Sequence, residues 1–84
     1  MTSHDTIIEL DSRTIHGIEV RLLWHQADDR VTVTVRDQRS GESLEVAVRD
    51  DENALEVFRH PYAFAAFHGV EPRSENRRLT ATLS

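Results

Sequence analysis

The chain of 84 residues contains no cysteine and no lysine. Without cysteine it can form no disulfide, no thiolate metal site and no cysteine nucleophile, although its redox compartment is left open. All ten basic residues are arginine, and the net charge is −5. Such a chain repels nucleic acid and anionic membranes on average, so we expect neither as its main partner.

Glycine is also scarce, with only three residues, so a glycine-rich phosphate loop is absent, as is a Gly-x-Ser-x-Gly nucleophile motif. The five histidines form no His-x-x-His or His-x-x-x-His pair, and the acidic runs are typical of turns and helix caps. We therefore expect no metal, no cofactor and no catalytic residues, which means that the protein is not an enzyme.

Long hydrophobic runs are missing, and the chain is too short for a second core. The first ten residues, MTSHDTIIEL, carry two acids and no basic or apolar block, unlike a secretory signal. We expect a single soluble, cytoplasmic domain over residues 1–69. Residues 70–84 are predicted to form a flexible tail, with an edge strand at Leu79 to Leu83 as the alternative.

Apolar and polar residues alternate in three segments, which is typical of half-buried strands. The segments are 18–25, 30–37 and 44–48, and their predicted inward residues are Ile18, Val20, Leu22, Trp24, Val31, Val33, Val35, Leu44, Val46 and Val48. Gln26 to Asp29 and Asp37 to Gly41 have turn chemistry, and Gly41 suits a positive φ. The pattern predicts a three-stranded antiparallel meander.

A fourth strand is predicted at Thr6 to Leu10, with its register left open by the polar residues that follow. Residues 13–16 are interpreted as an extension of the first meander strand, and Gly17 as a β-bulge.

After Arg49 the apolar period changes to that of a helix. Asp50 or Asp51 is the predicted N-cap, and Leu55, Phe58 and Tyr62 are predicted to face the sheet. Pro61 should end or kink this helix, and a second helical turn should run from Pro61 to Phe67 and stop at Gly69. The predicted fold class is α+β, a three- or four-stranded antiparallel meander packed against a kinked C-terminal helix.

Four of the five aromatic residues lie in the segment FRHPYAFAAF. One interpretation is a docking patch around Tyr62, Phe64 and Phe67 for another copy or another protein. The other is that the kink turns all four aromatic rings into the core. Leu23, on the polar face of its strand, is a second candidate contact residue.

The leading functional hypothesis is a small non-enzymatic protein-interaction module that self-associates, through the aromatic segment or a sheet edge. The alternative is a nucleic-acid-binding domain whose sheet or tail arginines contact phosphates. The arginines of this alternative are Arg21, Arg36, Arg49, Arg73, Arg77 and Arg78.

Several segments together carry a family resemblance: LLW at 22–24, DRVTVTVRD at 29–37, SGE at 40–42 and the pattern ending in HPYAFAA at Ala66. About 50 residues of the chain resemble a group of short uncharacterised actinobacterial proteins. The resemblance implies a bacterial cytoplasmic setting and no particular activity.

Overall fold

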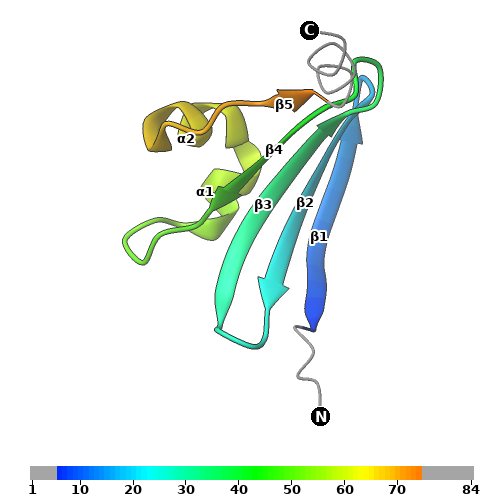
Figure 1. Ribbon diagram of the computed structural model, residues 1–84. Helices are drawn as coiled ribbons and strands as arrows, with labels where there is room; N and C mark the ends of the chain where they lie inside the picture. The colour runs from blue at the N-terminus through cyan, green and yellow to red at the C-terminus, as the bar shows by residue number, and fades with distance from the viewer. Residues whose placement is uncertain (1–5, 75–84) are drawn as a thin grey trace, which may run out of the picture.

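The computed structural model describes residues 6–74 and has the predicted α+β architecture (Figure 1). Its elements in chain order are β1 (Ile7–Ile15), β2 (Ile18–His25), β3 (Arg30–Asp37), β4 (Glu42–Ala47), α1 (Ala54–Arg59), α2 (Pro61–His68) and β5 (Arg73–Ser74). The strands form one antiparallel sheet in the order β1-β2-β3-β4-β5. The four-stranded form of the meander is therefore the correct one, with the two-residue β5 added at its edge.

The β1–β2 hairpin is longer than predicted. Residues 13–15 belong to β1 and do not extend β2, and His16 and Gly17 form the turn with φ values of 54° and 79°. Two consecutive positive φ values give a reversal whose twist matches that of the strands. The predicted bulge at Gly17 is wrong, because the register shift lies between Glu9 and Asp11.

The predicted strands of the meander are confirmed. Trp24 Nε1 donates to Asp29 Oδ1 at 2.8 Å across the β2–β3 turn. In the β3–β4 turn, Gly41 has a φ of 78° and its N–H donates to the Asp37 carbonyl at 2.8 Å. Both turns form where the polar clusters of the sequence predicted them.

The two short helices are separated at the predicted place. Asn53 caps α1, because its Oδ1 accepts the N–H groups of Leu55 and Glu56 at 2.9 and 3.2 Å. The prediction of Asp50 or Asp51 as the cap is wrong. Pro61 occupies the first turn of α2, and Gly69 ends it in the left-handed conformation with a φ of 77°.

The predicted apolar stripe of the helix is only partly correct. Val57 and Phe58 are the buried residues of α1, whereas Leu55 and Tyr62 are about half exposed. The prediction placed Leu55, Phe58 and Tyr62 on one face because it treated the segment as one continuous helix through residue 60. Because the chain turns at His60, α2 presents a different face, with Pro61 and Ala65 buried.

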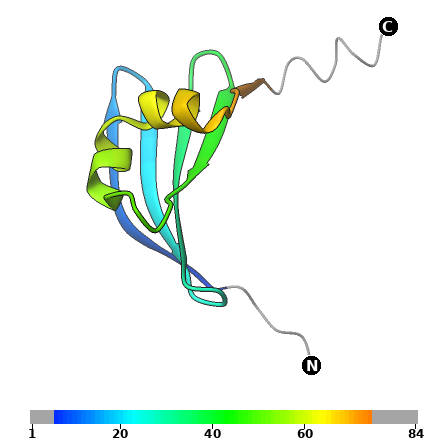
Figure 2. The same ribbon diagram turned by 90° about the vertical axis from the view of Figure 1, so that its left-hand side faces the viewer.

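The core lies between the helices and one face of β2, β3 and β4 (Figure 2). Its buried members are Val20, Leu22, Val33, Val35, Leu44, Val46, Val57, Phe58 and Ala65. No residue of β1 belongs to this cluster or to the partly buried side chains packed against it. Strand β1 is consequently attached to the domain mainly through its ladder with β2.

Residues 70–74 of the predicted tail run back along the sheet. Val70 packs against the core, and Arg73 and Ser74 pair with Ser43 and Glu42 of β4. The alternative strand at Leu79 to Leu83 lies outside the described residues.

Between residues 6 and 74, no helix combines the length and apolarity needed to cross a membrane.

A largely buried hydrogen bond joins the loop before α1 to the end of α2. His68 Nε2 lies 2.7 Å from Glu52 Oε2, and both side chains are less than 10% exposed, at 6% and 9%. The other carboxylate oxygen accepts the Arg49 N–H at 3.0 Å. The hydrogen bond from His68, followed by that from Arg49, lowers the pKa of Glu52.

We predict that Glu52→Gln lowers the thermal midpoint at pH 7, and that the difference from the parent shrinks as the pH falls. A carboxyl whose pKa is lowered by folding stabilises the protein above its unfolded pKa, here near 4.5, and this contribution is lost as the pH drops below that value. Thermal denaturation between pH 7 and pH 3 measures the effect. Glu56→Gln, at an exposed site, is the control. A difference independent of pH would contradict the prediction.

Candidate interaction surfaces

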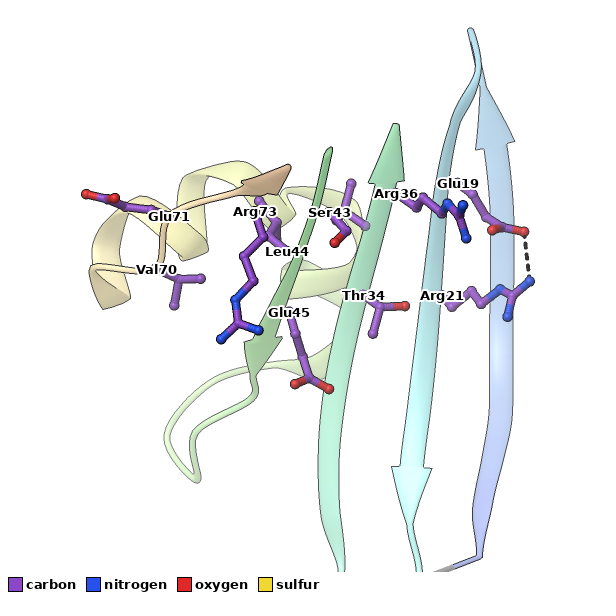
Figure 3. Close-up of a pocket in the computed structure, with 11 residues that line it drawn as sticks. Glu19, Arg21, Thr34, Arg36, Ser43, Leu44, Glu45, Val70, Glu71 and Arg73 are labelled. Atoms are coloured by element: carbon purple, nitrogen blue, oxygen red, sulfur yellow. Dashed lines mark hydrogen bonds and ion pairs between the residues drawn. The ribbon is translucent and has the colours of Figure 1, made fainter. Parts of the chain in front are cut away.

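A hollow of about 580 Å³ lies on the sheet face opposite the helices (Figure 3). It is lined by residues of β2, β3 and β4 together with Val70, Glu71 and Arg73. Its charged residues are Glu19, Arg21, Arg36, Glu45, Glu71 and Arg73. Arg21 forms ion pairs with Glu19 at 3.0 Å and with Glu9 at 3.5 Å. Three cations and three anions therefore balance within one hollow.

The arginines of the nucleic-acid hypothesis do not form one cationic surface. Arg21, Arg36 and Arg73 share the hollow with an equal number of acids. Arg49 lines a different hollow, in which the acids Asp28, Asp29, Asp50 and Glu52 outnumber the arginines. Arg77 and Arg78 lie outside the described residues. A phosphate backbone is bound by closely spaced cations, and residues 6–74 do not supply such a stripe.

The aromatic segment is divided between the core and the surface. Phe58 is 6% exposed and Phe64 packs against the core, whereas Tyr62 and Phe67 are 49% and 75% exposed. Five residues along a helix correspond to a rotation of about 140°, so Tyr62 and Phe67 point to different sides of α2. Burial, followed by the nearby charges of Asp37 and Glu42, raises the pKa of Tyr62. The exposed rings are thus two separate sites and not one patch.

We predict that Phe58→Ala destabilises the protein by about 3–5 kcal/mol, as emptying a buried aromatic site usually does. In a domain of this size that is a large part of a total stability of about 4–12 kcal/mol. Phe67→Ala should change stability by less than about 0.5 kcal/mol, because the ring is mostly in solvent. Urea denaturation of both variants measures the contrast, and equal costs would contradict the division described above.

Leu23 is half-buried on the sheet face opposite the helices, where it pairs with Thr32. Thr32 and His25, on the same face, are 1% and 5% exposed, and His25 Nε2 lies 2.9 Å from Thr32 Oγ1. Thr32 was not among the residues predicted to face the core, yet it is almost fully buried on the opposite face. This end of the outer face contains a small buried cluster, so Leu23 is less accessible than a lone exposed leucine.

Strand β1 forms the outer edge of the described sheet (Figure 1). Four large aliphatic side chains on it are between about one third and one half exposed: Ile7, Ile8, Leu10 and Ile15. Its nine residues include no proline and no lysine, the residues that commonly protect a sheet edge. The sequence identified residues 6–10 as a strand but not the full length of this edge.

Arg13 is the residue of β1 that contacts the helices. Its Nη2 donates to the carbonyls of Phe58 and Arg59 at 2.9 and 3.0 Å, and its guanidinium lies 5.3 Å from the centre of the Phe58 ring. These carbonyls belong to the end of α1, where hydrogen-bond acceptors lack helical partners. Nothing in the sequence signalled this contact, since 45 residues separate Arg13 from Phe58.

A second, more apolar cleft of about 380 Å³ lies between the β1–β2 turn and the junction of α1 with α2. Its apolar walls come from Ile15, Ile18, Val20, Pro61, Tyr62 and Ala63, and its polar lining comes from Arg13, His16, Arg59 and His60.

Among the described residues, no group of three or more histidine or acidic side chains is arranged to hold a metal ion.

Comparisons with known proteins identify no relative: no protein-family model, no curated protein and no solved structure matches the chain.

Proposed function

We propose that the protein is a binding module, not an enzyme, which self-associates by pairing β1 with β1 of a second copy. The observation that carries this proposal is a nine-residue edge strand that pairs with β2 on one side and, among residues 6–74, with no strand on the other. Its four partly exposed aliphatic side chains lie outside the core. Such a strand buries little in its own domain and offers a template for another strand.

The backbone of β1 supports the proposal. The Gln26 N–H donates to the Thr6 carbonyl at 3.0 Å, so the backbone groups of Thr6 point toward β2. Because these groups alternate in direction along an antiparallel strand, those of Ile7 and Glu9 point to the free edge. At the other end, Ile15 and Ile18 close the two-residue turn, and Thr14 therefore also points outward.

A second copy is favoured because the two edges of the sheet differ. The opposite edge, β4, is partly covered by β5 and contacted by α2, which leaves β1 as the one long free edge between residues 6 and 74. Two identical strands related by a two-fold axis pair in an antiparallel manner and use up the β1 edge of both copies, so association through this edge stops at a dimer. Arg21 already pairs with Glu9, which reduces the repulsion between facing acids.

We predict that Thr14→Pro makes the protein monomeric while the fold is kept. Proline removes an N–H that points to the free edge and not one that bonds to β2. Analytical ultracentrifugation up to about 1 mM, the concentration at which even weak association shows, measures the mass, and circular dichroism checks the fold. Thr14→Val, which keeps the N–H, is the matched control and should remain dimeric.

A parent protein that is monomeric at every concentration would contradict self-association. A dimer that survives Thr14→Pro but is lost on Phe67→Ser would instead place the contact on the aromatic segment. A dimer that survives both changes but is lost on Leu23→Ser would place it on the outer face of the sheet.

A further inference from the structure

The cleft at the helix junction differs in charge from the rest of the protein. Its described lining includes two arginines and two histidines and no acidic residue, in a chain with a net charge of −5. The other two charged hollows described above each contain at least three acids. The charges of this cleft therefore favour an anion more than those of the other two hollows do.

The polar groups of the cleft are mainly hydrogen-bond donors. Arg59 has a 65% exposed side chain, and its one ion pair within residues 6–74, with Glu56, is long at 3.7 Å. Helix α2 begins at the cleft without a capping side chain, so its first-turn amide groups depend on other acceptors. Arg13 Nε is the one buried side-chain donor between residues 6 and 74 that lacks an acceptor.

The walls of the cleft are apolar and can contact a hydrocarbon group of a ligand. Ile15 and Ile18 come from the hairpin, and Pro61, Tyr62 and Ala63 come from the start of α2. Clefts of roughly 300–1,000 Å³ with apolar walls and a few converging polar groups are typical of small-ligand sites. At about 380 Å³, this cleft is at the small end of that range.

We propose that this cleft binds a small carboxylate with an apolar body, such as a medium-chain fatty acid, with the carboxylate at Arg59 and the hydrocarbon against the isoleucines and Tyr62. Arg13 is a positioning residue, since its Nη2 is already held by the carbonyls of Phe58 and Arg59. An exposed arginine with one long ion pair, beside an apolar wall, fits such a ligand because it can form two charge-assisted hydrogen bonds with one carboxylate. The site does not depend on the dimer proposed above.

The test is titration of the ¹⁵N-labelled full chain with octanoate, followed by amide chemical shifts. We expect saturable shifts at Ile15, Ile18, Tyr62 and Ala63, and affinity about tenfold weaker for octanol, which has the same hydrocarbon chain without the charge. Arg59→Gln should weaken octanoate binding about tenfold, and Glu56→Gln should leave it equal or tighter, because it frees Arg59. Arg36→Gln, on the opposite face of the sheet, is the matched control and should bind like the parent.

Equal binding of octanoate and octanol, or shifts that map to the outer-face hollow, would overturn the proposal. Saturable shifts unaffected by Arg59→Gln would also overturn it. Repeating the titration on the monomeric Thr14→Pro variant separates the two proposals, because the cleft should bind octanoate whether or not the chain is a dimer.

Discussion

The break between the two helices at His60 and Pro61 is the constraint on which much of the structure depends. Proline has no N–H to continue the first helix, so the chain turns and the carbonyls of Phe58 and Arg59 are left without helical donors. Arg13 donates hydrogen bonds to both carbonyls and thereby connects the edge strand to the helices. The same turn brings Phe64 and Ala65 to the core, leaves Tyr62 outside, and opens the basic cleft beside the hairpin.

The exposed apolar surface of the domain results from helices that are too short to cover the whole sheet. Two helices of six and eight residues can shield only part of one face of the sheet, and they shield β2, β3 and β4. Strand β1 keeps its backbone pairing but not its burial, so its isoleucines and Leu10 contribute to the surface. An edge strand that is long, apolar and weakly held is suited to bind another strand, whereas the balanced charges of the opposite face are suited to water.

Features set by neighbouring residues were predictable from the sequence, and features set by distant contacts were not. Strict alternation identified β2 to β4, and Pro61 and Gly69 marked the helix ends. Strand β1 was underestimated because Asp11, Ser12 and Arg13 look like a break and because His16 adopts a positive φ that few side chains favour. Asn53 is a preferred capping residue and was a readable signal. The Arg13 contact and the basic cleft require the tertiary fold, because they join residues about 45 positions apart.

The order of strands in the sheet is the same as their order in the chain, and this has a kinetic consequence. Each hairpin can form from residues close in sequence, so chain entropy opposes formation of the meander only weakly. Sheets whose strands pair with their neighbours in sequence fold faster than sheets whose strands pair over long separations. The slower step is expected to be the docking of the helices, when Arg13 meets Phe58 and Glu52 meets His68, since only then is the apolar face of the sheet covered. Until that step, the nascent chain exposes its valine-rich strands together with the edge of β1, which makes early collapse and association compete for the same surfaces.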